Sequence, residues 1–209
     1  MYNECCFSLM ARMPDNFVDI VFTSPPYNRK RNDKYLHYND TIDDYYNFLF
    51  KAIGESIRVS SGLVFFNIMK NYYNKDDVFR IIGNFSNQIC ELFIWEKSNP
   101  LPAAGKAITN AYEFIIVFGD KIKSNTTYTK NHITTPVTKM PKFHKAVMNE
   151  KIALFFIEKF TKPGDIIYDP FMGIGTTGVI AKQLGRGFIG SEISKEYYEI
   201  AIKNIDNLN

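Results

Sequence analysis

Short apolar runs alternate with stretches of helical spacing along most of the chain. Continuous apolar runs predict buried strands, and they cover residues 18–22, 63–68, 89–95, 112–118, 166–168 and 188–190. Helical spacing, with capping and stop residues, predicts helices over 9–17, 41–59, 75–82, 149–160, 177–184 and 194–205. Because strands and helices alternate, the pattern favours an α/β protein with an open, mostly parallel sheet.

The stretch from Asp165 to Glu192 joins a predicted strand, a glycine-rich turn, a helix and a second strand that ends in an acid. Gly173, Gly175 and Gly178 have G-x-G-x-x-G spacing directly after the first strand. Glycines let the backbone approach a ligand, and the helix N-terminus presents free N–H groups to it. Glu192 stands where an acid accepts hydrogen bonds from ribose hydroxyls. The order of elements therefore favours a nucleotide-type cofactor site over a purely structural turn.

A second motif, Thr23-Ser24-Pro25-Pro26-Tyr27, directly follows the predicted strand 18–22. Two consecutive prolines fix φ twice and remove two amide donors, so the loop is stiff and its carbonyls are free to face a ligand. A rigid turn at a strand end is the plainer interpretation. A serine before the prolines and an aromatic residue after them is a rarer combination, which favours a catalytic role.

Together the two motifs resemble those of the S-adenosylmethionine-dependent DNA amino-methyltransferases, in the subgroup whose catalytic motif precedes the cofactor motif. The resemblance rests on Ser24 to Tyr27, on Asp169-Pro170-Phe171-x-Gly-x-Gly-Thr-Thr, and on Leu184 to Gly190 with Glu192. It implies a Rossmann-like methyltransferase fold: a mostly parallel twisted sheet with helices on both faces and an antiparallel edge hairpin. It further implies one catalytic domain over 1–209, with the two motifs on adjacent strands.

The resemblance also implies the cofactor S-adenosyl-L-methionine and the residues that bind it. The motif itself supplies Asp169, Pro170, Phe171, Gly173, Gly175, Thr176, Thr177 and Glu192. An N-terminal strand beside the one ending at Glu192 would bring Glu4 and Cys5 near the adenine. The run from His144 to Glu150 resembles the family segment at the methionine end, which implies contacts from His144, Met148 and Asn149. Both prolines of that family segment are replaced here, by Lys145 and Asn149.

The implied catalytic residues are Ser24, Pro25, Pro26 and Tyr27. The Ser24 hydroxyl and the Pro25 carbonyl would accept the two hydrogens of an exocyclic amine, with Tyr27 stacked on the flipped base. Methylation of cytosine at ring carbon 5 instead needs a thiolate, usually after a proline, and none of the three cysteines follows one. The sequence therefore favours amine methylation.

The type of base is less firmly indicated than the reaction. Ser-Pro-Pro-Tyr is more typical of cytosine-N4 enzymes and Asp-Pro-Pro-Tyr of adenine-N6 enzymes, so we expect cytosine, probably the more natural partner of Ser24, in a restriction–modification system, with adenine as the alternative. Three further alternatives stay open: a non-catalytic cofactor-binding subunit, methylation of RNA or protein, and a nicotinamide oxidoreductase. Against the last, Pro170 and Phe171 stand where a dinucleotide loop brings its first glycine.

The net charge is only +3, but the basic residues are unevenly placed. Such clusters in loop-like stretches fit a phosphate-binding surface and double-stranded DNA as partner. The expected DNA-binding residues are Arg29, Lys30, Arg31, Lys97, Lys106, Lys121, Lys123, Lys130, Lys139 and Lys142. The segment 121–143 corresponds to the family's target-recognition segment but is short, which leaves a homodimer or a partner subunit open as the source of specificity.

Composition sets outer limits on the class of protein. Apolar residues make up 45% and aromatic residues 15% of the chain, which indicates a globular protein. No run of about 18 apolar residues and no leader-like segment is present, so we expect neither a membrane span nor secretion. The three cysteines lack metal-ligand spacing. We therefore expect no metal and a cytoplasmic location.

Overall fold

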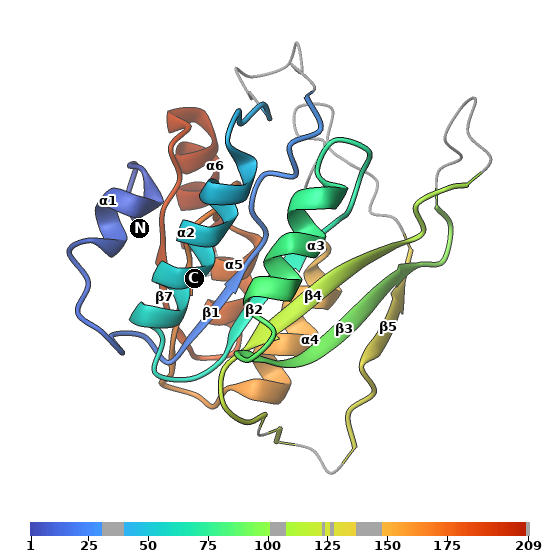
Figure 1. Ribbon diagram of the computed structural model, residues 1–209. Helices are drawn as coiled ribbons and strands as arrows, with labels where there is room; N and C mark the ends of the chain where they lie inside the picture. Colours follow the sequence, from blue (N-terminus) through green and yellow to red (C-terminus); the bar gives the residue numbers. More distant parts are fainter. Residues whose placement is uncertain (31–39, 101–107, 123, 126–127, 137–147, 208–209) are drawn as a thin grey trace.

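A computed structural model of the protein describes residues 1–30, 40–100, 108–122, 124–125, 128–136 and 148–207. Its centre is a seven-stranded sheet with the strand order β5-β3-β4-β2-β1-β6-β7 (Figure 1). The strands are β1 (Ile20–Thr23), β2 (Val64–Ile68), β3 (Ile89–Lys97), β4 (Tyr112–Phe118), β5 (His132–Thr135), β6 (Ile166–Asp169) and β7 (Gly187–Gly190). Within the described residues, β4 is antiparallel to both of its neighbours and the other pairs are parallel. The predicted mostly parallel α/β sheet is confirmed.

The helices follow the predicted pattern, with shifted starts near the N-terminus. They are α1 (Cys6–Met10), α2 (Tyr45–Val59), α3 (Lys75–Asn84), α4 (Glu150–Phe160), α5 (Thr176–Gln183) and α6 (Lys195–Asp206). Asp44 caps α2 and Ser194 caps α6, each accepting a hydrogen bond from a first-turn amide. The helix predicted over 9–17 instead spans Cys6–Met10, and the predicted N-terminal strand is reduced to one bridge, between Tyr2 and Ser191.

Helices cover both faces of the sheet, because successive strand residues point to opposite sides. Val21 and Val64 belong to the core on the side of α1, α2 and α3, whereas Phe22 and Phe65 belong to the core on the side of α4 and α5. Figure 1 shows α2 and α3 in front of the sheet and α4 and α5 behind it. On the second face the rings of Phe22 and Phe156 stack with centroids 5.6 Å apart.

The hairpin of β3 and β4 does not form the edge of the sheet, as the sequence predicted. Instead β5 lies parallel to β3 and covers it. This strand falls inside 121–143, where the sequence lacks apolar periodicity. It is held by polar contacts: Trp95 Nε1 donates to Thr135 Oγ1 at 2.8 Å, and Thr134 Oγ1 donates to Glu96 at 2.9 Å. A strand that pairs through polar side chains carries little hydrophobic signal, so the sequence pattern missed it.

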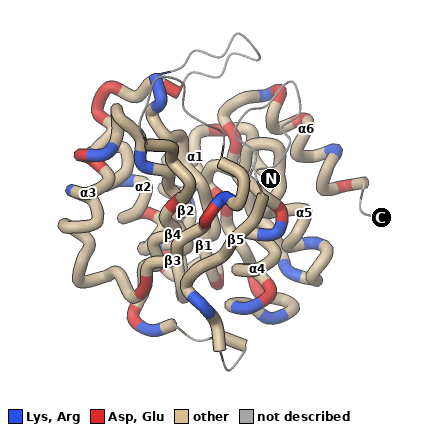
Figure 2. The backbone as a smooth tube through the Cα atoms, turned by 90° about the vertical axis from the view of Figure 1, so that its right-hand side faces the viewer, with Lys and Arg blue, Asp and Glu red and all other residues tan. Residues whose placement is uncertain are grey.

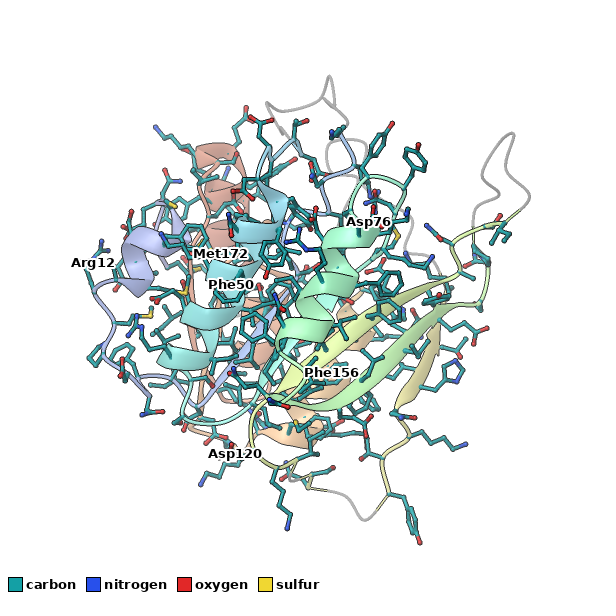
Figure 3. All side chains as sticks on the ribbon, viewed as in Figure 1. Arg12, Phe50, Asp76, Asp120, Phe156 and Met172 are labelled. Carbon is teal, nitrogen blue, oxygen red and sulfur yellow. The ribbon has the colours of Figure 1, made fainter. Side chains whose placement is uncertain are left out.

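The order of the strands creates one edge at which several loops meet. From β1 the chain proceeds to β2 on one side, and from β6 it proceeds to β7 on the other, so the strand order reverses between β1 and β6. Ligands bind at the carboxyl ends of strands at such a reversal. Because β4 runs antiparallel to β2, it ends at the opposite edge. Figure 3 shows the two edges, with Asp76 near the upper one and Asp120 at the lower one.

Candidate active site

The serine–diproline motif and the glycine-rich motif lie side by side at this edge. Strands β1 and β6 pair in parallel, with Val21 opposite Tyr168. Beyond that pair, Thr23 Oγ1 donates a hydrogen bond to Asp169 Oδ1 at 2.7 Å, which joins two residues 146 positions apart in sequence. The predicted adjacency of the strands that carry the two motifs is therefore present in the structure.

The Asp169 carboxylate holds the two motifs together from below. Besides Thr23, it accepts hydrogen bonds from Thr177 Oγ1 at 2.6 Å and from the Phe171 amide at 3.0 Å. Asp169 is 4% exposed. Burial raises the pKa of its carboxyl to about 6, although the two threonine hydroxyls and the amide act in the opposite direction. We predicted Asp169 and Thr177 as cofactor contacts, but here their side chains bond to each other and position the loop.

The three glycines of the turn have different structural reasons. Gly173 and Gly175 have φ of +53° and +86°, a region that favours glycine. A Cβ at Gly178 would lie 2.5 Å from Ile205 and 2.6 Å from Phe188. Gly178 is therefore explained by packing of α5 against α6 and β7, and not by close approach of a ligand. Gly175 begins α5, which no side chain caps, so the first turn offers amide donors beside Thr176.

Glu192 lies half-buried at the tip of β7, where an acid was predicted. Its Oε2 accepts from the Gly173 amide at 3.0 Å, and its Oε1 accepts from the Ser194 amide at 2.8 Å. Burial raises the pKa of this carboxyl, against the lowering effect of the amide bonds. Each oxygen retains a further lone pair, so the carboxylate is fixed in direction and still able to accept from a diol.

The N-terminal segment lies beside β7, as predicted, through hydrogen bonds of Tyr2 with Gly190 and Glu192. Cys5 is half-buried at the start of α1. The Glu4 carboxylate, however, is bound by both terminal nitrogens of Arg12. The predicted adenine contact of Glu4 would therefore compete with an ion pair.

The backbone of the serine–diproline corner leaves one carbonyl open. The Pro26 carbonyl accepts from the Tyr45 hydroxyl at 2.6 Å, and the Tyr27 carbonyl accepts from the Asn71 and Asn74 side-chain amides at 2.7 and 2.8 Å. No donor from the described part of the chain reaches the Pro25 carbonyl. The two acceptors that an amino group needs, Ser24 Oγ and the Pro25 carbonyl, are thus both present at the corner.

Ser24 opens into a buried polar network that the sequence did not predict. Ser24 Oγ lies 2.8 Å from Tyr27 Oη, which donates to Glu113 Oε2 at 2.7 Å. The Asn67 amide lies within 3.2, 2.6 and 2.8 Å of Ser24 Oγ, Tyr27 Oη and Glu113 Oε2. Lys97 Nζ forms an ion pair with the other Glu113 oxygen. The available signal was one polar residue inside each of two apolar strands, Asn67 in β2 and Glu113 in β4.

Two predicted roles do not fit this network. Tyr27 is 9% exposed and packs in the core, and the Arg29 guanidinium lies 5.4 Å from its ring centroid. Little of the ring is left to stack on a base, so we correct that prediction. Lys97, predicted to bind DNA, is largely buried and paired with Glu113. A buried, paired ammonium does not serve as a phosphate contact.

The basic residues predicted to bind DNA divide between the two edges. Arg29 and Lys30 follow the catalytic corner, and Asp40 accepts from the Asn28 and Arg29 amides to hold this turn. Lys121 and Lys130 lie in the connection from β4 to β5, which passes the opposite edge, where the Asn125 amide donates to the Lys159 carbonyl. Their predicted contact with DNA at the site is therefore not supported. Figure 2 shows positive and negative residues interspersed over the described backbone.

Several predicted residues lie outside the described part of the chain, namely Arg31, Lys106, Lys123, Lys139, Lys142 and His144. Met148 is described and packs against the core on the α4 side. Asn149 caps α4, accepting from the Lys151 amide at 2.9 Å, and its own amide donates to the Pro136 carbonyl at 3.2 Å. Its side chain is therefore engaged in fold contacts.

Known proteins share both the sequence family and the architecture of this chain. The N6/N4 methyltransferase family model, described as DNA methylase, matches residues 18–203. The type II methyltransferase M.MwoI of Methanothermobacter wolfeii is 32% identical over 201 residues, which cover 85% of this chain and 29% of that protein. The type II methyltransferase M.HinfI of Haemophilus influenzae is 27% identical over 241 residues, which cover 96% and 66%. The chain thus spans 29% and 66% of the lengths of these two relatives.

Solved structures support the fold. The PvuII DNA methyltransferase, described as cytosine-N4-specific, superposes with a TM-score of 0.80 at 20% identity, covering 98% of this chain and 85% of that one. The complex of M1.HpyAVI with SAM superposes with a TM-score of 0.70 at 24% identity, covering 98% of both chains. The sheet and helices described above are therefore those of a methyltransferase fold.

Proposed function

The chain belongs to the N6/N4 family of DNA methylases, and from this premise we propose that it transfers a methyl group from S-adenosyl-L-methionine to an exocyclic amine of a flipped DNA base. The observation that carries this proposal is the 2.7 Å hydrogen bond from Thr23 to Asp169, since it joins the acceptor corner to the cofactor loop. The names of the relatives support a role in restriction–modification. One domain over 1–209 remains part of the proposal.

The residues at the edge of the sheet fit the cofactor. The free amides of the first turn of α5 and the half-buried Glu192 carboxylate offer donors and acceptors for its polar groups. Phe171 is half-buried beside this turn, with its ring 5.7 Å from that of Phe48. When bound, S-adenosylmethionine supplies an electrophilic methyl group on a sulfonium.

Ser24 and Pro25 perform the work on the acceptor. An exocyclic amine of cytosine or adenine is a weak nucleophile, because its lone pair is delocalised into the ring. Ser24 Oγ and the Pro25 carbonyl accept its two hydrogens and orient the nitrogen lone pair toward the methyl group. This contribution consists of positioning and preorganised dipoles and needs no covalent enzyme intermediate.

Transfer of labelled methyl to double-stranded DNA, followed by nucleoside analysis, tests the activity and the base. We propose cytosine N4, because serine at the first motif position is more typical of that class. N4-methylcytosine is the expected product, and N6-methyladenine would assign adenine instead. No labelled nucleoside with DNA of varied sequence would overturn the proposed activity. Titration with NAD separates the oxidoreductase alternative.

An exposed aromatic surface adjoins the catalytic corner and is a candidate contact for DNA. Tyr72 and Tyr73, 74% and 53% exposed, lie in the loop after β2, and Asn71 and Asn74 tie this loop to the Tyr27 carbonyl. Lys30 Nζ lies 5.6 Å from the Tyr73 ring centroid. Aromatic faces with nearby lysines suit unstacked bases and phosphates. This surface replaces the far-edge lysines in the proposal.

Tyr72→Ala is expected to weaken DNA binding by about 10-fold, since one base–aromatic stack contributes about 1–3 kcal/mol. Fluorescence anisotropy with labelled DNA at fixed salt measures the effect. Tyr128→Ala is the matched control, because Tyr128 is 91% exposed but lies in the connection from β4 to β5 near the opposite edge. Equal losses in both variants, or loss only at Tyr128, would contradict the assignment of this surface.

A further inference from the structure

The hydrogens available in the buried network decide which way the Ser24 hydroxyl points. Glu113 is paired with Lys97 and carries no hydrogen to donate. The hydrogen between Tyr27 Oη and Glu113 Oε2, 2.7 Å apart, therefore belongs to Tyr27. Tyr27 has only that one, so the 2.8 Å contact between its oxygen and Ser24 Oγ requires the hydrogen of Ser24.

This direction of donation leaves Ser24 as an acceptor. With its hydrogen turned toward Tyr27, Ser24 Oγ receives the Asn67 amide at 3.2 Å and keeps a lone pair for one more donor. Ser24 is half-buried and is the member of the network that also belongs to the open corner. A serine hydrogen turned the other way would point at the hydrogens of an amino group and repel them.

We propose that Glu113 is a positioning residue for methyl transfer, which acts through Tyr27 to hold Ser24 Oγ as an acceptor of the amine hydrogen. The inference rests on the proposed function. Glu113 belongs to β4, 4% exposed, and reaches Ser24 only through Tyr27 and Asn67. Lys97 on β3 binds its second oxygen and thereby keeps it charged and fixed. The network thus links three neighbouring strand regions to one acceptor atom.

A purely structural network would stabilise these strands without affecting the chemical step. The two cases differ in a double-mutant cycle of Tyr27→Phe and Glu113→Gln on the single-turnover rate of methyl transfer, at saturating DNA and S-adenosylmethionine. Each single variant is expected to lower the rate by about 10-fold or more, and the double variant by no more than the slower single one. The Kd of S-adenosylmethionine is expected to stay within about two-fold.

Glu96→Gln is the matched control, because Glu96 lies on β3 in an exposed pair with His132. Its rate is expected to equal that of the wild type. Unchanged rates in Tyr27→Phe and Glu113→Gln, or losses that multiply in the double variant, would overturn the inference while the proposed function stands. If Glu113→Gln fails to fold with Lys97 unpaired, Tyr27→Phe decides, since it removes a single oxygen. A wild-type chain without transfer would overturn both proposals.

Discussion

Replacing Ser24 by alanine is expected to lower the single-turnover rate of methyl transfer by about 100-fold or more, in the range seen when one preorganised hydrogen-bonding group is removed from a reacting centre. The variant removes one of the two acceptors for the amine hydrogens and leaves the Pro25 carbonyl in place. Radiolabelled methyl transfer under single-turnover conditions measures the rate. Calorimetry of S-adenosylmethionine binding measures the other half of the expectation, an unchanged Kd.

The separation of rate from affinity follows from the geometry. Ser24 bonds to Tyr27 and Asn67, whereas the cofactor loop is held by Asp169 and Glu192. Ser86→Ala is the control, because Ser86 is exposed just beyond α3 at the far edge. An equal loss of rate and of cofactor affinity in Ser24→Ala would contradict the role of Ser24 and indicate a general collapse of the corner.

Replacing Asp169 by alanine is expected to lower the free energy of unfolding at pH 5 by about 3 kcal/mol or more. The change leaves the Thr23 and Thr177 hydroxyls and the Phe171 amide without their buried acceptor, and each such orphan costs about 1–3 kcal/mol. Denaturant unfolding followed by circular dichroism measures the loss. Asp169→Asn keeps the shape and one acceptor oxygen, so a smaller loss is expected for it.

The same pair of proteins isolates the titration of Asp169. Burial raises its pKa from 3.8 to about 6, so the folded state holds the proton more tightly than the unfolded state does. The stability that this proton binding adds is complete below the unfolded pKa and is lost as the pH rises through about 6. Two pKa units correspond to roughly 3 kcal/mol. Between pH 4 and pH 7, the wild type should lose about that much relative to Asp169→Asn; parallel curves would contradict the assignment.

The sequence predicted the elements that bury apolar residues and the adjacency of the two motifs. Runs such as 63–68 and 112–118 became buried strands because their apolar content leaves no other stable placement. Glu192 was predicted at a strand tip from the strand–helix–strand order, and it lies there with its carboxylate fixed by two amides. Local patterning thus reached the backbone frame of the site.

What the sequence could not predict depends on contacts between distant residues. Asn67, Lys97 and Glu113 meet only because β4 runs antiparallel between β2 and β3. Spacing along the chain does not encode that arrangement, so Lys97 was predicted as a surface charge. Tyr27 was predicted to face a base, but its hydroxyl finds buried partners that only the folded sheet supplies. Side-chain direction at these positions is a tertiary property.

The far-edge lysines show the same limit. Lys121 and Lys130 belong to a basic stretch, and a basic stretch by itself does not say at which edge of a sheet it will lie. The antiparallel direction of β4 carries the chain away from the catalytic corner before β5 returns. Charge therefore predicted a partner class, whereas strand direction decides which charges reach it.

The most direct test of the central claim is a crystal structure of the protein bound to S-adenosylmethionine. The account predicts that the sulfonium methyl points toward the serine–diproline corner, within roughly 6 Å of Ser24 Oγ, which leaves room for one amino nitrogen between them. A cofactor whose methyl group faces another surface, or that binds away from Glu192 and the start of α5, would contradict it.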